Sequence, residues 1–120
     1  MKTLILILLA AVLQLHAADL KKLSVLYIAD GEASRTDAFK KLLETHVAKY
    51  EVVKRSGFNP AKAEPFDVVL LDWHQGGDTQ SERKRPCPLG DRNKWEKPTV
   101  LLGSAGLNVA VVWQVRGGGG

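Results

Sequence analysis

Two short runs of the sequence, residues 67–71 and 98–102, are apolar at nearly every successive position. A strand with water on one face alternates apolar and polar side chains, whereas a strand covered on both faces is continuously apolar. Continuously apolar strands are typical of parallel sheets, in which helices cover both faces. The two runs therefore predict an α/β domain built around a parallel sheet.

Strand-like and helical patterns fill the rest of the chain. The predicted strands are residues 23–29, 51–54, 67–71 and 98–102. The predicted helices are residues 37–50, which are apolar at a 3.6-residue spacing, and residues 107–115. Thr36 is the expected N-cap of the first helix. The connection over residues 56–66 is short for a crossover helix, so it predicts a single turn or an extended crossover.

The order of these elements predicts the topology of the sheet. Right-handed crossovers place the second strand outside the first, and the third strand on the first strand's other side. We therefore expect a flavodoxin-like three-layer domain with a parallel sheet of about four strands, in the order 2-1-3-4. The glycines at residues 117–120 come one residue after the last predicted helix, so the domain is predicted to be incomplete at its C-terminus.

The first residues of the chain have the features of a signal peptide. Lys2 supplies a positive charge, residues 4–13 form an apolar run, and Ala17 is a small residue at the cleavage position. This run is half of the roughly 20 residues that span a bilayer. We therefore expect residues 1–17 to be a signal peptide and residues 18–120 a single partial α/β domain. The mature protein is predicted to be exported, periplasmic or secreted, without a stable membrane anchor.

Charge and cysteine content narrow the range of partners. The only tight basic cluster is Arg83, Lys84 and Arg85, and no aromatic residue is interleaved with it. Nucleic-acid binding would need a broader basic stripe, so it is not predicted. Cys87 is the only cysteine, so it is a free thiol or an intermolecular link. The preceding basic run would lower its pKa modestly.

The candidate site residues follow the predicted strands. Ligands of open α/β sheets bind beyond the carboxyl ends of the strands, where the strand order reverses. Asp30 follows the first strand, Trp73 and His74 the third, and Ser104 the fourth. Asp30 either binds a ligand or caps the turn into Gly31. Trp73 offers an aromatic platform or packs against the next loop, and His74 is a ligand-binding group, a general base or a polar loop residue.

Ser104 lies in a turn of small residues, L-G-S-A-G at positions 102–106. A strand-to-helix turn of this kind exposes a nucleophile in G-x-S-x-G enzymes, and it also points backbone N–H groups at anions. Here Leu102 replaces the first glycine, and His74 precedes the serine, whereas elbow enzymes place their histidine late in the chain. Three interpretations stay open: close packing of a helix, a polar or anionic ligand site, and a serine nucleophile. The spacing of residues predicts no metal site and identifies no cofactor.

Three segments, residues 25–31, 66–74 and 101–106, together resemble exported proteins of the class I glutamine amidotransferase-like superfamily. Within it they are similar to the ThuA-like (trehalose-utilisation) branch, over roughly residues 23–117. The resemblance implies the flavodoxin-like fold and a connection with carbohydrates. Amidotransferases of this superfamily carry G-x-C-x-G followed by a histidine and an acid. Ser104 stands at the cysteine position and no histidine follows it, so the resemblance does not imply glutaminase chemistry.

The sequence leaves three functional hypotheses. The first is an exported domain that binds a small polar ligand, such as a sugar, through Asp30, Trp73, His74 and Ser104. The second is a serine or cysteine hydrolase that uses Ser104 or Cys87 with His74. The third is an inactive fragment of a longer enzyme. Two helices cover little of a four-stranded sheet, so we also expect marginal stability and self-association as a homo-oligomer.

Overall fold

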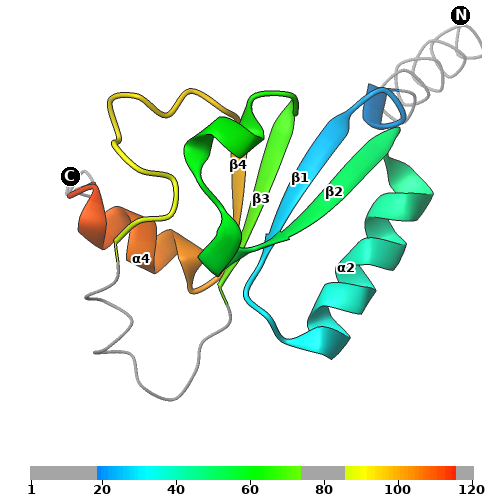
Figure 1. The fold of residues 1–120 in the computed structure, drawn as a ribbon, viewed down its shortest axis with the longest axis horizontal. Helices are drawn as coiled ribbons and strands as arrows, with labels where there is room; N and C mark the ends of the chain where they lie inside the picture. Colours follow the sequence, from blue (N-terminus) through cyan, green and yellow to red (C-terminus); the bar gives the residue numbers. More distant parts are fainter. Residues whose placement is uncertain (1–18, 74–85, 116–120) are drawn as a thin grey trace, which may run out of the picture.

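Four parallel strands in the order β2-β1-β3-β4 form the centre of the structure, a computed structural model that describes residues 19–73 and 86–115 (Figure 1). They are β1 (Ser24–Ala29), β2 (Lys49–Lys54), β3 (Val68–Trp73) and β4 (Thr99–Gly103). Each neighbouring pair of strands is parallel. The predicted flavodoxin-like α/β class and the strand order 2-1-3-4 are confirmed.

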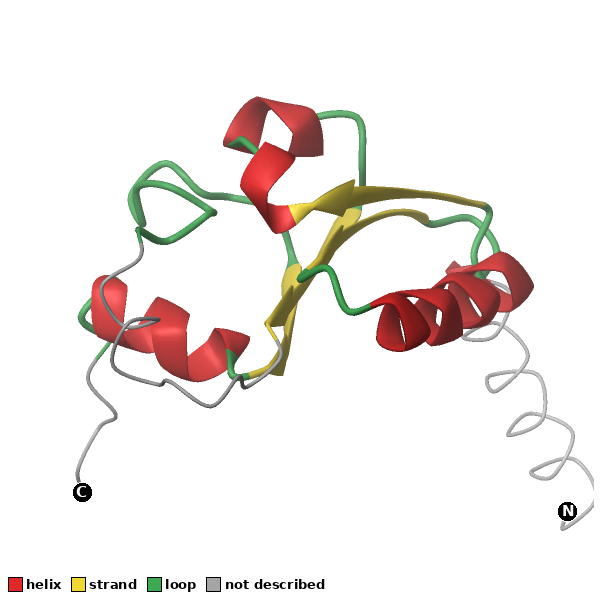
Figure 2. Cartoon of the chain, turned by 60° about the horizontal axis from the view of Figure 1, so that its bottom comes forward, coloured by secondary structure: helices red, strands yellow, loops and turns green. Residues whose placement is uncertain are grey.

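Helices lie on both faces of this sheet (Figure 2). Helix α2 (Ala33–His46) packs on one face and helix α4 (Ala105–Val112) on the other. Two short 3-10 helices, η1 (Arg55–Gly57) and η2 (Pro60–Ala63), fill the connection from β2 to β3 on the α4 side. The prediction that this connection is too short for a full crossover helix is confirmed.

The first helix begins earlier than predicted. It starts at Ala33, because Glu32 and not Thr36 is its N-cap. The Glu32 carboxylate accepts the backbone N–H of Arg35 at 3.1 Å, which satisfies one of the unpaired donors of the first turn. Glutamate is not among the usual N-cap residues, so the sequence did not indicate that the helix starts here.

The predicted end of the helix at residue 50 is also wrong. The helix ends at His46, and Tyr50 belongs to β2, where it pairs with Val25 of β1. Val47 and Tyr50 both pack against the apolar core between the sheet and α2. Their spacing therefore matches that of the apolar residues in the helix, although neither residue is helical. Helix α4 begins at Ala105, ahead of the predicted residue 107.

The sheet separates two apolar cores. The residues of β1 alternate between them: Leu26 and Ile28 face α4, whereas Val25 and Tyr27 face α2. The α4-side core also contains Ala63, Phe66, Val69, Leu71, Trp73, Leu89, Ala105 and Val109. The α2-side core also contains Ala29 and Leu43. Both faces of the two central strands are therefore covered, as their sequences predict.

The outer strand β4 is covered less well than its sequence predicts. Val100 and Leu101 are 46 % and 39 % exposed, although they belong to an apolar run of three residues, 100–102. In the register with β3, Val100 lies beside Leu70 and Leu101 beside Leu71, so the two exposed residues lie on opposite faces. The sequence of β4 is therefore that of a central strand, and among the described residues its position is that of an edge strand.

Several predicted features lie outside the described residues. These are the signal peptide at residues 1–17, His74, the basic cluster of residues 83–85 and the glycines at 117–120. Within residues 19–73 and 86–115, no helix is both long enough and apolar enough to cross a bilayer.

Candidate functional site

The carboxyl ends of β1, β3 and β4 meet at one edge of the sheet, because the strands are parallel. Asp30 follows β1, Trp73 ends β3, and Ser104 follows β4. Trp73 is in register with Gly103, so Ser104 lies one residue beyond the level at which β3 ends. The topology thus places three of the four predicted site residues at the same edge, and the fourth, His74, lies outside the described residues.

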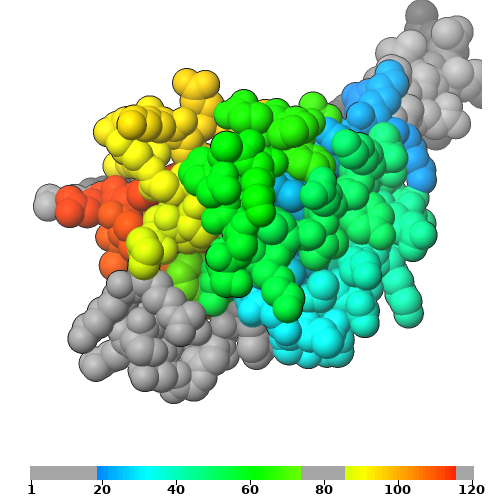
Figure 3. All heavy atoms as spheres, in the orientation of Figure 1, coloured from blue at the N-terminus to red at the C-terminus, as the bar shows by residue number. Residues whose placement is uncertain are grey.

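A cleft of about 630 Å³ opens at this edge, on the α4 side of the sheet. It lies between two segments, residues 54–60 and residues 86–90, and the space-filling view shows the green and yellow parts of the chain around these segments side by side (Figure 3). Asp30 and Trp73 line this cleft, whereas Ser104 does not. The structure therefore brings two of the predicted site residues together in one cleft.

Trp73 combines a packing role with an unusual polar feature. The residue is 1 % exposed and belongs to the α4-side core, yet it also borders the cleft. The guanidinium carbon of Arg55 lies 4.0 Å from the centre of its ring, a cation–π contact. Its indole Nε1 is buried and has no hydrogen-bond partner within residues 19–73 and 86–115. Leaving a buried donor without an acceptor costs about 1–3 kcal/mol.

Asp30 has the capping role that was one of its two predicted alternatives. Its Oδ1 accepts the backbone N–H of Glu32 at 3.1 Å, and Gly31 between them has a φ of +105°. This turn carries the chain from β1 into α2. Asp30 also lines the cleft, so its turn-forming role positions a carboxylate there.

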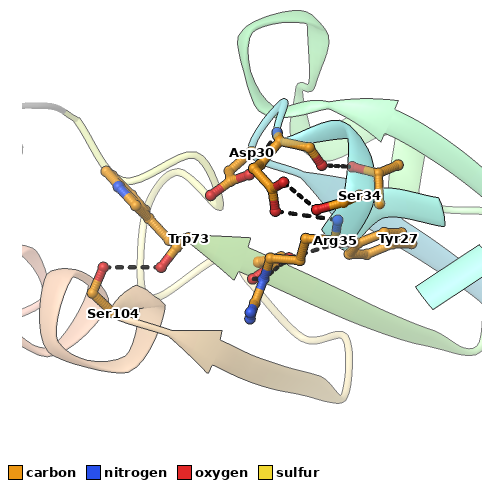
Figure 4. Close-up of polar contacts among 9 residues, drawn as sticks. Tyr27, Asp30, Ser34, Arg35, Trp73 and Ser104 are labelled. Carbon is orange, nitrogen blue, oxygen red and sulfur yellow. Dashed lines mark hydrogen bonds and ion pairs between the residues drawn. The ribbon is translucent and has the colours of Figure 1, made fainter. Parts of the chain in front are cut away.

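The side chain and the backbone of Ser104 both form hydrogen bonds to the end of β3. Its hydroxyl donates to the backbone carbonyl of Trp73 at 2.9 Å, and its N–H donates to the same oxygen at 2.7 Å (Figure 4). Gly103 has a φ of +64°, and a Cβ at this position would lie 2.4 Å from that oxygen. A nucleophilic serine directs its proton at a base, whereas this hydroxyl directs it at a carbonyl. The geometry favours the packing interpretation of the small-residue turn.

A second polar cluster lies on the α2 side of the same edge, and the sequence did not single it out as a site. Asp72 is fully buried and accepts a hydrogen bond of 2.7 Å from the hydroxyl of Tyr27. It also accepts Nε of Arg35 at 2.7 and 3.0 Å (Figure 4). The available signal was an aspartate inside an apolar strand, because a carboxylate there needs partners when it is buried.

The electrostatics of this cluster hold the protons on Tyr27 and Arg35. Burial and the hydrogen bond to Asp72 raise the pKa of Tyr27 far above its usual range. The hydrogen bond to Asp72 likewise raises the pKa of Arg35. A general acid or base needs a pKa near the working pH, and neither group meets that condition. The hydrogen bonds of Asp72 join β3 to β1 and α2.

Cys87 lines the cleft, but its environment does not activate it. Burial raises the pKa of its thiol and outweighs the backbone hydrogen bonds from Leu89 and Gly90 that lower it. The net shift is therefore upward, and the basic run that was expected to lower the pKa of Cys87 lies outside the described residues. The thiolate is the nucleophilic form of cysteine, so a raised pKa makes this group less reactive.

Within the described part of the chain, no three histidine, cysteine, aspartate or glutamate side chains are grouped so that they could hold a metal ion. No known protein family, curated protein or solved structure matches this chain. The resemblance to ThuA-like proteins therefore stays a prediction. The geometry of the cleft carries the functional interpretation.

Proposed function

We propose that this protein binds a small polar ligand, such as a sugar, in the cleft at the carboxyl end of its sheet. The observation that carries the proposal is Trp73, a residue that lines a cleft of about 630 Å³ and whose buried indole Nε1 has no hydrogen-bond partner among the described residues. Small-molecule sites commonly measure about 300–1,000 Å³. Parallel α/β sheets also bind ligands at this edge.

The lining of the cleft suits a ligand with both apolar and hydroxyl-bearing faces. Phe58 and three prolines supply apolar surface, and Ser56 and Asn59 supply hydrogen-bonding groups. A few polar groups set in a largely apolar wall are typical of sites that orient a small molecule. A sugar ring offers the matching combination of C–H faces and hydroxyl edges.

We also propose that the protein is exported and belongs with the ThuA-like proteins. The support for export is the apolar run at residues 4–13 followed by Ala17. The support for the family is the resemblance of residues 25–31, 66–74 and 101–106, together with the parallel sheet of order 2-1-3-4. This family connection is a second reason to test sugars first.

Binding without covalent chemistry is the better supported alternative. The hydroxyl of Ser104 is engaged with the carbonyl of Trp73, and the pKa of the Cys87 thiol is raised. A hydrolase would need one of these groups to be activated by a base. Labelling by a fluorophosphonate probe that disappears in Ser104→Ala would contradict this interpretation.

The proposal is tested by calorimetric titration of the full chain with a panel of monosaccharides and their acid derivatives. Trp73→Phe keeps an aromatic ring and removes the N–H, so we expect roughly a tenfold loss of affinity for any ligand that binds the cleft. Trp95→Phe is the matched control, because the indole N–H of Trp95 donates to Thr99 and the residue does not line the cleft. Equal affinities of Trp73→Phe and the unmodified protein would overturn the proposed site.

A further inference from the structure

Strand β4 has one edge without a neighbouring strand in the described part of the chain (Figure 1). At its two ends the backbone points toward β3, because the C=O of Pro98 accepts from Val69 at 2.9 Å and the N–H of Ser104 donates to Trp73 at 2.7 Å. Backbone groups alternate in direction along a strand, so those at every second position point away from β3: Thr99, Leu101 and Gly103. The outer edge of β4 therefore presents donors and acceptors with which another strand can pair.

This edge lacks the side chains that usually discourage pairing. Natural edge strands carry charged residues, prolines or bulges, and β4 (T-V-L-L-G) contains none of the charged residues or prolines. Val100 and Leu101 are exposed on opposite faces of the sheet. A strand that pairs with β4 would therefore find apolar neighbours on both faces.

The apolar surface continues from β4 onto the helix that follows it. Helix α4 lies against the strand, since a Cβ at Gly106 would be 3.8 Å from the Cβ of Leu101. Leu107 and Val111 are one helical turn apart and both exposed. A surface helix normally has polar side chains at such positions, as Lys40 of α2 illustrates. The outer surface of α4 is therefore apolar where it should be polar in a monomer.

The charge pattern indicates which partner fits this surface. Residues 98–115 contain no charged residue, whereas the full chain has a net charge of +4. A charged partner gains no attraction from an uncharged surface, and two copies of the chain avoid their mutual repulsion by meeting there. Residues 74–85 contain no large apolar side chain, so their sequence offers little apolar cover for this surface. A second copy of the chain supplies a matching uncharged and apolar surface.

From these observations we infer that β4 pairs with β4 of a second copy, in antiparallel orientation across a two-fold axis. Pairing over the whole strand places Leu101 opposite Leu101 of the partner subunit, and Thr99 opposite Gly103 of the partner subunit. The two four-stranded sheets then form one continuous sheet. An axis perpendicular to this sheet places both copies of α4 on the same face, where Leu107 and Val111 of the two copies meet.

Cysteine cross-linking of the full chain tests this arrangement, with Cys87→Ser as the background to remove the native thiol. Directly opposite residues whose backbones are hydrogen-bonded have Cα atoms about 5.5 Å apart, within the range of a disulfide. Leu101→Cys should therefore give a disulfide-linked dimer under mild oxidation. Val100→Cys is the matched control, because the two introduced thiols would lie diagonally, with Cα atoms about 7–8 Å apart. We expect it to cross-link at least about tenfold more slowly.

A second measurement follows the association state directly. Leu101→Lys places two like charges opposite each other, so the dissociation constant of the dimer should rise at least about tenfold in light scattering after size exclusion. Leu42→Lys is the matched control, because Leu42 is an exposed leucine on α2. Circular dichroism checks that both variants are folded, and the cross-linking result decides if Leu101→Lys is not.

Four results would overturn the inference. These are a chain that stays monomeric up to about 1 mM, equal cross-linking at positions 100 and 101, a dimer that survives in Leu101→Lys as well as in Leu42→Lys, and a monomer whose Leu101 amide is protected from hydrogen exchange. The last result would show that the edge of β4 is covered within one chain. None of them bears on ligand binding in the cleft.

Discussion

The two outer strands of the sheet occupy similar positions and have opposite sequences. In β2 (K-Y-E-V-V-K) polar and apolar residues alternate over the first half, and charges stand at both ends. In β4 (T-V-L-L-G) no residue is charged, and Val100 and Leu101 are 46 % and 39 % exposed. The first is the pattern of an edge strand and the second that of a strand covered on both faces. Position in the sheet and sequence thus agree for β2 and disagree for β4.

The difference bears on association between molecules. Charged residues on an edge strand discourage pairing with another chain, and β2 has them. The whole segment from residue 99 to residue 115 contains no charged residue, and Leu107 and Val111 of α4 are also exposed. We therefore propose that homo-oligomers, where they form, form through β4 and α4 and not through β2.

The two sides are also joined to the centre of the sheet in different ways. Asp72 is held by a buried polar network that reaches from β3 to β1 and α2. Strand β4 is continued into α4 by the turn at Gly103 and Ser104, which contacts the backbone of Trp73. If the buried network of Asp72 holds its side of the sheet more firmly, substitutions in that network should lower the free energy of unfolding more than substitutions on β4.

The largest effect is expected for Asp72→Ala. The substitution leaves the buried Tyr27 hydroxyl without its acceptor and removes the carboxylate partner of Arg35. Breaking a buried pair costs about 3–5 kcal/mol, and we expect about 3 kcal/mol because the Arg35 side chain is 30 % exposed. Urea denaturation measures the loss. Glu44→Ala, at an exposed position of α2, should change the free energy of unfolding by less than about 0.5 kcal/mol.

Gly103→Ala should cost about 2 kcal/mol, because its φ of +64° is unfavourable for a residue with a Cβ. The added Cβ would also lie 2.4 Å from the carbonyl oxygen of Trp73, so the backbone of the turn must shift. Gly57→Ala is the control, because nothing lies within 4 Å of a Cβ at that position. A loss at Gly103 as large as that of Asp72→Ala would show that β4 is as firmly joined as the opposite side.

The alkaline stability of the protein should depend on Tyr27. Its pKa is raised in the folded state, so the folded chain keeps this proton where the unfolded chain loses it, above about pH 10. The stabilisation that this group contributes is therefore constant below about pH 10 and is lost progressively as the pH rises beyond it. Tyr27→Phe should lose about 1 kcal/mol at neutral pH and show a shallower alkaline fall. An unchanged alkaline fall in this variant would contradict the assignment.

The smallest effect on stability is expected on β4 itself. Val100→Lys places a charge on a half-exposed edge position, so we expect a change of less than about 1 kcal/mol in the free energy of unfolding. Light scattering after size exclusion should nevertheless show less self-association than in the unmodified protein. Glu51→Lys on β2 keeps a charge on that edge and should leave the association state unchanged. If Val100→Lys and Glu51→Lys changed self-association equally, the proposal that β4 and not β2 mediates association would be wrong.

The sequence predicted the arrangement of the sheet because that arrangement follows from local patterns. Apolar runs separated by turns identified the strands, and the handedness of crossovers ordered them. The start of α2 was missed because an unusual cap, Glu32, sets it. The partners of Asp72 were missed for a different reason: they lie 37 and 45 positions away, and no local pattern encodes such a contact.

The candidate site shows the same division. Topology alone placed Asp30, Trp73 and Ser104 at one edge of the sheet, and the structure has them there. Topology did not indicate which of them faces the cleft. Lys54 and Arg55 went unnoticed because the cleft forms where two loops approach each other, and the sequence does not specify that approach.

The central position of β1 has a consequence for the order in which the chain acquires its structure. β1 precedes the other three strands in the sequence, yet Leu26, Tyr27 and Ile28 are at most 1 % exposed in the finished fold. Their cover comes from later elements, and the hydroxyl of Tyr27 meets Asp72 only 45 positions further on. A growing chain therefore carries this apolar strand uncovered until β3 has been synthesised. During that interval chaperones that bind short apolar segments would protect this strand from aggregation.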